Sequence, residues 1–440
     1  MNKHEETVRC AIQMCLKVIK SYEWLSDLYV LDFFVDNHWS KLPQCWQNCF
    51  NDMDPKDLGN ILTGQQSKHM LPLSFLALKK SIDVLSIPRL SSYKSSTNKS
   101  DSVNHEWTDN PKFKNLFLKH VKLKKRHEIS VMSDFVNNTV KKAGCNAVLD
   151  FGSGLGHLIR ILSYKNNIQT IGIEMQAKLT AEARKLDLEL EYTVKKYLTE
   201  ETMSKLIRPN HINLILSSLQ QLEEIPLDTE KYGLIGLHPC GDLGPLLIKH
   251  FVNSEDVKFI CIVGCCFMKL SCNKEPCGYP MSQYLKGLNN DLSYFSREIA
   301  CHAIETYCKR LCNGDYNDLK VHAYRAALEK ILRQLDPKLM HMPVRNVKHT
   351  NNMTFEEYCT AALHKLSIDP LNSSGVETDL LQWKKVVVLY TLRLAIAPLV
   401  ETLILLDRVL FILEHGISCT IHPVFDPEIS PRNHIIVGIK

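Results

Sequence analysis

The pattern of apolar and polar positions divides the chain into a helical start, an alternating middle and a second helical region. Four apolar residues near the start recur at helical spacing: Val8, Ile12, Leu16 and Ile19. Residues 91–104 contain six serines and almost no apolar side chain, which is typical of a linker. We therefore expect a helical N-terminal region over 1–90 and a flexible linker over 91–110.

The middle of the chain alternates strand-like and helix-like segments. Five short apolar runs have the length of strands: 146–152, 168–174, 212–218, 232–238 and 257–264. Segments with helical spacing separate several of them, and this alternation is typical of an α/β protein with a doubly wound parallel sheet. The sheet-forming core is predicted to cover 111–270.

The last third of the chain returns to a helical pattern before two final strand-like runs. Residues 271–385 are predicted to form a helical insertion, and the apolar stretch from Val386 to Leu413 one or two buried helices. The runs ISCTIHPVFD and NHIIVGIK follow. We expect the segment 386–440 to supply a last helix and a strand pair that completes the same sheet.

Composition and charge exclude few classes of protein. The 440 residues are 45% hydrophobic and 23% charged, and the net charge of +5 is too small to indicate nucleic acid by itself. Charged side chains interrupt the longest apolar stretch, so we expect no membrane span. Sixteen cysteines and an acidic start without a signal-peptide pattern favour a reduced, cytoplasmic or nuclear, non-secreted protein.

The stretch VLDFGSGLGHL, residues 148–158, follows the first predicted strand and carries the first candidate site. Gly152, Gly154 and Gly156 would let the backbone approach a ligand closely. His157 stands where a dinucleotide fingerprint requires a small residue. Asp150 would repel a pyrophosphate but attract an ammonium group, and S-adenosylmethionine carries one. The stretch favours S-adenosyl-L-methionine over a nicotinamide cofactor or a plain glycine-rich turn.

Other residues complete the predicted cofactor pocket. Glu174 ends the second strand, where a carboxylate can accept hydrogen bonds from ribose hydroxyls. Ser218 and Gln220 follow the third strand and are expected to border the adenine. The predicted cofactor-binding set is Asp150, Gly152, Ser153, Gly154, Gly156, Glu174, Ser218 and Gln220.

The segment HPCGDLGP, residues 238–245, ends the fourth strand and should border the same crevice. His238 could remove a proton near neutral pH. Asp242 could orient His238, accept a proton or cap the next helix. His238, Cys240 and Asp242 are the predicted catalytic residues.

Nine of the sixteen cysteines lie between residues 240 and 312. They include no C-x-x-C pair, and their spacing fits no zinc pattern, so we expect no metal site. The turn from Cys265 to Phe267 is expected to line the pocket, with Tyr279 in a loop above it. Cys265, Phe267 and Tyr279 are therefore predicted to contact the substrate.

The segment 111–127, PKFKNLFLKHVKLKKRH, has seven Lys or Arg residues and no acid. Its apolar residues fall at helical spacing, and the basic residues could attract the phosphates of RNA. The alternative is a solvated helix face. Lys124, Lys125 and Arg126 are predicted to contact the substrate.

Several segments together resemble the methyltransferase-like protein 25 family, which includes proteins with a ribosomal RNA adenine dimethylase domain. They are KKRHEIS, VLDFGSGLGHL, HPCGDLG, VGCCF, GYPMS and SPRNHIIVGIK. The resemblance implies a class I methyltransferase Rossmann-like doubly wound sheet that uses S-adenosylmethionine. A helical N-terminal region and a helical insertion before the last two strands would be added to it.

A second resemblance concerns the acceptor. The H-x-C-G unit and the later Cys265–Cys266 pair are similar to transfer-RNA ribose 2′-O-methyltransferases, although Phe267 and Met268 replace the histidines of those enzymes. The sequence therefore favours an S-adenosylmethionine-dependent methyltransferase with RNA as substrate. The alternatives are a protein or small-molecule methyltransferase, or an inactive methyltransferase-fold protein that binds a partner protein through its helical insertion.

Overall fold

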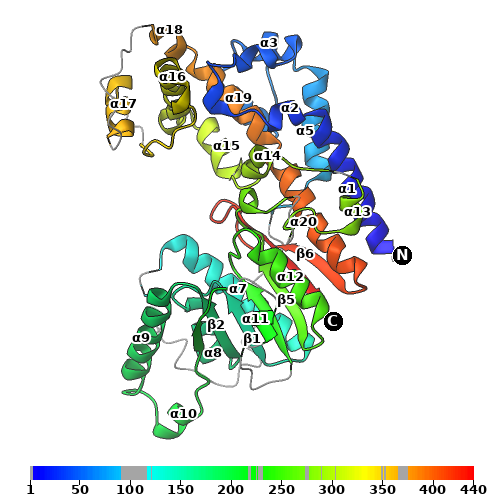
Figure 1. The fold of residues 1–440 in the computed structure, drawn as a ribbon, viewed down its shortest axis with the longest axis vertical. Coiled ribbons are helices and arrows are strands. Elements are labelled where there is room, and N and C mark those ends of the chain that lie inside the picture. The colour runs from blue at the N-terminus through cyan, green and yellow to red at the C-terminus, as the bar shows by residue number, and fades with distance from the viewer. Residues whose placement is uncertain are drawn as a thin grey trace. The chain divides into compact units, whose positions relative to one another are not determined.

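The computed structural model forms two compact units (Figure 1). Unit 1 comprises Met1–Ile12, Pro88–Asp291 and Leu403–Lys440, and unit 2 comprises Gln13–Ile87 and Leu292–Thr402. The structure describes residues 3–90, 116–119, 121–216, 220–223, 225, 231–272, 277–288, 290–302, 304–347, 350, 353–364 and 375–440.

Unit 1 contains a seven-stranded sheet with the strand order β3-β2-β1-β4-β5-β7-β6. The first five strands in this order are parallel, and β7 runs antiparallel to both β5 and β6. The strands are β1 (Ala147–Phe151), β2 (Gln169–Glu174), β3 (Asn210–Asn213), β4 (Tyr232–Gly236), β5 (Val257–Val263), β6 (Ser418–Pro423) and β7 (His434–Ile439). The predicted doubly wound sheet is confirmed, including its completion by the final strand pair.

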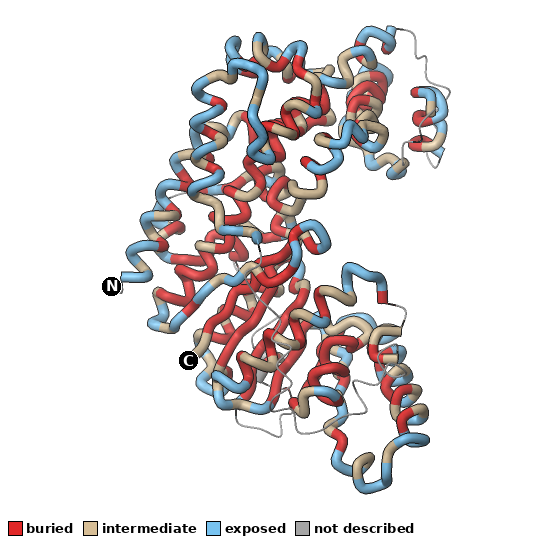
Figure 2. The backbone as a smooth tube through the Cα atoms, turned by 180° about the vertical axis from the view of Figure 1, so that it is seen from behind, coloured by how far each residue is buried: buried red, intermediate tan, exposed pale blue. Residues whose placement is uncertain are grey.

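The central strands are buried on both faces, which explains their continuous apolar sequences. All five residues of β1 and of β4 are buried, and the strands form the red centre of unit 1 in Figure 2. Along β5, Phe259 belongs to the core beneath α7 (Leu123–Ala143) and α8 (His157–Tyr164). Its neighbour Ile260 lies on the opposite face, near Phe251 of α12 (Leu243–Asn253). Helices therefore cover both faces of the sheet.

The sheet order places a topological switch point at β1 and β4, where doubly wound sheets bind their ligands. The chain proceeds from β1 to β2 on one side and enters β4 on the other, so the two strands flank a topological switch point. The remaining helices of unit 1 are short or lie on its outer layers: α9 (Ala177–Val194), α10 (Glu200–Ser204), α11 (Gln220–Glu223), η3 (Phe267–Lys269) and α13 (Gln283–Lys286).

The described residues of unit 2 contain helices and no strand. Two of the four boundaries between the units fall inside helices, namely α1 and α20, which therefore belong to both units. The elements of unit 2 are α1 (Lys3–Ser21), α2 (Glu23–Ser26), η1 (Val30–Asp32), η2 (His38–Lys41), α3 (Gln44–Phe50), α4 (Pro55–Leu62), α5 (Leu73–Leu85), α14 (Tyr294–Ile299), α15 (Ile304–Cys312), α16 (Asn317–Leu335), η4 (Pro337–Leu339), α17 (Phe355–Leu363), α18 (Glu377–Leu380), α19 (Trp383–Ala395) and α20 (Ala397–Glu414). Most of the predicted N-terminal region and most of the predicted insertion thus pack into one unit, whereas residues 1–12, 88–90 and 271–291 of these regions belong to unit 1.

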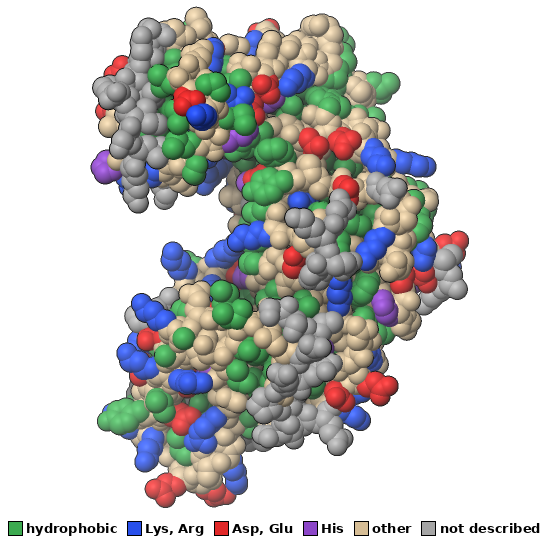
Figure 3. Space-filling view, in the orientation of Figure 1, with side chains coloured by type: hydrophobic (Ala, Val, Ile, Leu, Met, Phe, Trp, Pro, Cys, Tyr) green, Lys and Arg blue, Asp and Glu red, His purple; other side chains and the backbone are tan. Residues whose placement is uncertain are grey.

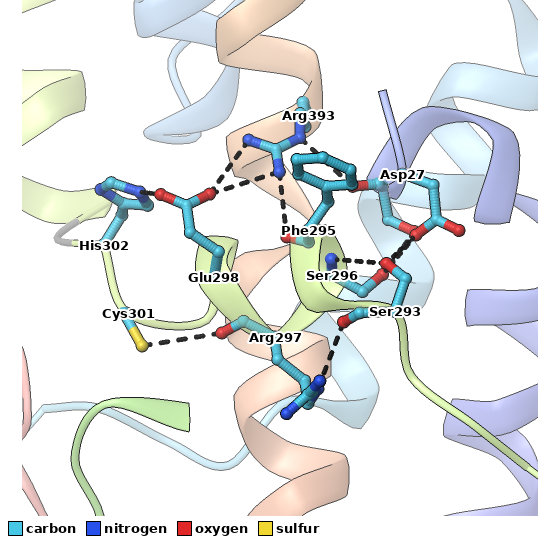
Figure 4. A network of polar contacts seen from close by, with 10 residues as sticks. Asp27, Ser293, Phe295, Ser296, Arg297, Glu298, Cys301, His302 and Arg393 are labelled. Carbon is cyan, nitrogen blue, oxygen red and sulfur yellow. Dashed lines mark hydrogen bonds and ion pairs between the residues drawn. The ribbon is translucent and has the colours of Figure 1, made fainter. Parts of the chain in front are cut away.

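A buried polar network joins these distant segments of unit 2 (Figure 4). The Arg393 guanidinium donates to the backbone oxygens of Ser26 at 3.2 Å and Phe295 at 2.9 Å, and it pairs with Glu298 at 3.3 Å. Asp27 accepts a 2.6 Å hydrogen bond from the Ser293 hydroxyl. The network fixes the α2 end against α14 and α19.

None of the helices in the described part of the chain combines the length and hydrophobicity that crossing a bilayer requires.

Candidate functional site

The glycine loop after β1 adopts a conformation that favours glycine at three positions. The φ angles of Gly152, Gly154 and Gly156 are +76°, +57° and +69°, all in the left-handed region. A Cβ added at Gly152 or Gly154 would meet no atom within 4 Å, whereas one at Gly156 would lie 2.4 Å from the His211 ring. The first two glycines therefore border open space, and the third permits close packing.

Two carboxylates lie at the adjoining strand ends. Glu174 ends β2, and its side chain accepts hydrogen bonds from the Gly154 amide at 3.0 Å and the Gln176 amide at 2.9 Å. Asp150 in β1 is 4% exposed. Burial raises its pKa to about 7, and Glu174 adds to that rise while Lys125 opposes it. A cationic ligand would favour ionised Asp150, so the open loop and its two acids fit the ammonium and ribose groups of S-adenosylmethionine.

A buried ionic cluster contacts the backbone of the glycine loop and stabilises it. Arg160 of α8 is 1% exposed, pairs with Asp187, and donates a 3.0 Å hydrogen bond to the Leu155 backbone oxygen. Asp187 also contacts His211 at 2.6 Å. Sequence reasoning missed this cluster, because Asp187 and His211 come from α9 and β3 rather than from the glycine motif.

The adenine side of the predicted pocket stays a prediction. Ser218 lies outside the described residues, and Gln220 begins α11 without a described side chain. Ser153 is partly buried, and its hydroxyl has no hydrogen-bond partner among the described residues.

Three distant segments meet at the end of β4. His238 lies just beyond that strand, and its Nε2 is 3.2 Å from a carboxylate oxygen of Glu128 in α7. Glu128 is 2% exposed, and its other oxygen accepts a 2.6 Å hydrogen bond from the Ser430 hydroxyl. Burial lowers the pKa of His238, but the Cys265 thiol and Glu128 outweigh it and raise this pKa to about 9. His238 is therefore mostly protonated at pH 7 in this state.

Asp242 has a different partner from those the sequence predicted. Its carboxylate accepts a 2.9 Å hydrogen bond from the Ser271 amide, and it neither bonds His238 nor caps α12 through its side chain. A Cβ at Gly278 would lie 2.0 Å from the same carboxylate. Asp242 therefore holds the segment after η3, and Glu128 occupies the orienting position expected of Asp242.

The predicted substrate contacts beyond β5 require correction. Phe267 and Tyr279 are 0% exposed, so neither ring lies on a surface that a substrate reaches. The Tyr279 hydroxyl accepts a 3.2 Å hydrogen bond from buried Asn290. Cys240 and Cys265 do remain accessible, and they form a backbone bridge between the ends of β4 and β5.

The basic residues at the start of α7 differ in their partners. Lys122 and Lys125 are exposed, while Lys124 lies 3.7 Å from Glu128. Arg126 is half-buried and donates a 2.7 Å hydrogen bond to the Val121 backbone oxygen. Residues 111–115 and 120 of the predicted basic segment lie outside the described residues. Figure 3 shows Lys and Arg side chains over the visible face of unit 1, with acidic ones among them.

Sheet order and sequence comparison together define the class of this protein. Residues 124–273 match the family model described as a methyltransferase domain, and this range runs from α7 past β5. With its antiparallel seventh strand and its glycine loop after β1, the chain contains a class I methyltransferase domain, a class that uses S-adenosylmethionine as methyl donor.

The resemblance to methyltransferase-like protein 25 is confirmed by two relatives, each named "Probable methyltransferase-like protein 25". The mouse protein is 30% identical over 242 residues, covering 50% of this chain and 39% of the relative. The human protein is 26% identical over 270 residues, covering 56% of this chain and 43% of the relative. The chain thus spans about two fifths of the length of these relatives.

Solved structures of other methyltransferases are also similar. Magnesium protoporphyrin IX methyltransferase from Synechocystis, with bound SAH, aligns with a TM-score of 0.22 and 16% identity over 36% of this chain and 68% of its own. The plantazolicin methyltransferase BamL, in complex with a triazolic desmethylPZN analog and SAH, aligns with a TM-score of 0.23 and 16% identity. This alignment covers 65% of this chain and 85% of BamL.

Proposed function

We propose that the chain transfers the methyl group of S-adenosylmethionine to RNA. The observation that carries this proposal is the course of α7. Lys122 at its N-cap and Lys125 in its first turn are exposed, and its second turn supplies Glu128 to the end of β4, beside the glycine loop. Cations that attract phosphates thus adjoin the edge where an acceptor would meet the methyl donor.

The cofactor would supply an electrophilic methyl group on a sulfonium. Asp150 would face the cationic part of this cofactor, and Glu174 would accept hydrogen bonds from the ribose. The open space above Gly152 and Gly154 would admit the ligand against the backbone. Direct methyl transfer mainly requires that donor and acceptor be held in line, and these residues would fix the donor.

RNA is preferred to a protein or small-molecule acceptor for two reasons. The exposed lysines lie on the same helix as Glu128, and His238, Cys240, Cys265 and Cys266 follow the pattern that resembles RNA ribose methyltransferases. An inactive methyltransferase fold that binds a partner through unit 2 is the other alternative.

Tritiated methyl transfer tests the proposal. The purified chain and labelled S-adenosylmethionine are incubated with extract from cells lacking the protein, and the products are divided between nuclease and protease. The Asp150→Ala/Gly154→Asp double variant is the blank. We expect nuclease-sensitive label above this blank. Label removed only by protease would reject RNA, and no label would favour the inactive fold or the need for a partner.

Two charge reversals on one helix isolate the role of the lysines. Lys122→Glu/Lys125→Glu changes the start of α7, and Lys141→Glu/Lys142→Glu makes the same change in its last turn, on exposed residues. We expect loss of RNA labelling only in the first variant. Because Lys125 acts on Asp150, S-adenosylhomocysteine binding is measured for both variants. Equal labelling by the two variants would contradict the RNA assignment.

A further inference from the structure

Three thiols cluster at the carboxyl ends of β4 and β5. The Cys266 Sγ lies 3.3 Å from the Cys240 Sγ and 3.5 Å from the Cys265 Sγ. Cys240 is exposed and the other two are partly exposed, whereas Cys261 within β5 is fully buried. The three thiols therefore do not serve as apolar core, and their mutual proximity requires another explanation.

We propose that Cys240, Cys265 and Cys266 bind a zinc ion, with His238 as the fourth ligand. Thiolates around tetrahedral zinc lie about 3.8 Å apart, given a Zn–S distance of about 2.3 Å. The ligand atoms of the three cysteines already lie within 4.8 Å of one another. The backbone bridge between Cys240 and Cys265 fixes the two loops that carry them. Three thiolates and one imidazole form a common zinc ligand set.

The surroundings of His238 match those of a metal-bound histidine. Its Nε2 contacts Glu128 at 3.2 Å, while its Nδ1 is buried without a hydrogen-bond partner among the described residues. The Cys265 thiol is near enough to the ring to help raise the pKa of His238. Histidine ligands usually bond a carboxylate through the nitrogen that faces away from the metal. In the zinc-bound protein, Nδ1 binds the ion, so His238 is a ligand and not the proton acceptor that the sequence predicted.

A buried arginine near the three cysteines would interact favourably with a negatively charged zinc site. Arg408 is 1% exposed, and its three guanidinium nitrogens have no hydrogen-bond partner in the described part of the chain. A Cβ on Gly264, which directly precedes Cys265, would lie 2.9 Å from its Nη1. The Arg408 guanidinium lies over the Phe267 ring at 5.5 Å, and the charges of Asp407 and Asp242 favour its ionised form. Three thiolates around Zn²⁺ leave a net negative charge, which would add to these favourable interactions.

The test uses the full chain and has a spectroscopic readout. Metal content is measured after exhaustive dialysis, and metal-free protein is then titrated with Co²⁺ under reducing conditions. We expect stoichiometric zinc, and tetrahedral Co²⁺ bands accompanied by a thiolate-to-cobalt charge-transfer band. Cys240→Ser and Cys266→Ser should lose both, while the matched Cys45→Ser, which changes an exposed thiol in α3, should retain them.

Variants of His238 and Glu128 test whether His238 is a zinc ligand and Glu128 only its hydrogen-bond partner. His238→Ala should keep the charge-transfer band but shift the ligand-field bands, because water replaces the imidazole. Glu128→Gln should weaken metal affinity by roughly 10–100-fold. His238→Ala with an unchanged spectrum would remove His238 from the ligand set and overturn the proposal as stated.

Other outcomes would overturn the zinc site itself. They are wild-type protein without stoichiometric zinc, Co²⁺ without a thiolate band, copper in place of zinc, or a disulfide between two of these cysteines. If a serine variant loses its cooperative thermal transition, it is unfolded, and the cobalt spectrum of the wild-type protein alone then tests the zinc site. The readout requires neither S-adenosylmethionine nor RNA, so its result is independent of the proposed function.

Discussion

Alanine substitutions at two glycines of one loop should both lower stability, but to different extents, and the less destabilising one should abolish cofactor binding. Gly154→Ala and Gly156→Ala both place a Cβ on a left-handed residue, which costs about 1–2 kcal/mol. At Gly154 the new methyl group would meet no atom of the protein within 4 Å. At Gly156 it would lie 2.4 Å from a His211 carbon.

His211 has little freedom to relieve this contact. It is 4% exposed and its Nε2 lies 2.6 Å from Asp187, which also pairs with Arg160. Overpacking of this kind costs about 1–3 kcal/mol beyond the backbone strain. We therefore expect Gly156→Ala to lower the free energy of unfolding by about 2–5 kcal/mol, and Gly154→Ala by about 1–2 kcal/mol.

The variant that keeps more stability, Gly154→Ala, should be the one that loses its affinity for the cofactor. The methyl group of Gly154→Ala projects into the space assigned to the ligand, so S-adenosylhomocysteine binding should be abolished while the protein stays folded. Urea denaturation measures stability, and isothermal titration calorimetry measures binding. Unchanged binding by Gly154→Ala would refute the placement of the ligand above this glycine. Equal stabilities of the two variants would refute the packing argument at His211.

Two further predictions concern charge. Arg393→Met removes a 3% exposed guanidinium from Glu298 and should lower the free energy of unfolding by about 3–5 kcal/mol in urea denaturation. The control Arg310→Met, at an exposed pair with Asp318, should lower it by less than about 1 kcal/mol. A similar loss of stability in both variants would contradict the structural role of Arg393. The raised pKa of Asp150 means that the folded ligand-free protein binds more protons than the unfolded chain between pH 3.8 and about 7, so its stability should fall as pH rises through that window. Affinity for S-adenosylmethionine should rise over the upper part of the same window as Asp150 ionises, and Asp150→Asn should remove both dependences in calorimetric titrations across pH.

The sheet could be predicted because its central strands are buried on both faces. Continuous apolar runs mark β1, β4 and β5, and their glycine-rich and polar ends mark the loops. The third strand is shorter than predicted, ending at Asn213 instead of residue 218. The Asn213 amide donates a 2.8 Å hydrogen bond to the Glu174 backbone oxygen, so its polar side chain closes the strand.

The composition of unit 2 could not be predicted from periodicity. Helical spacing shows which residues of a helix are apolar but does not show which other helix they contact. The pairing depends on single polar contacts between distant positions, such as Asp27 with Ser293 and Arg393 with the Ser26 backbone. Within the predicted helical insertion, α14 ends at Ile299 and α15 begins at Ile304, and Glu298 and His302 are in contact at 2.5 Å near this break.

Some residues of the candidate site lie in one short stretch of sequence, whereas others come together only in the fold. The glycine loop and Asp150 occupy one short stretch, so their spacing carries the chemistry. Glu128 and Ser430 are 302 positions apart and become partners only through the fold. Sequence proximity instead suggested Asp242 as the partner of His238, although the carboxylate of Asp242 bonds Ser271.

The proposed zinc site would not be recognised by spacing rules, because its ligands follow two parallel strands. Zinc motifs of the C-x-x-C type place two ligands on one turn, so they are visible in the sequence. Here Cys240 follows β4 and Cys265 follows the neighbouring β5, and the pairing of these strands brings the two cysteines together across 25 positions. The carboxyl ends of adjacent parallel strands lie at one edge of the sheet, so residues that follow such strands are better candidates for a shared site than their sequence spacing suggests.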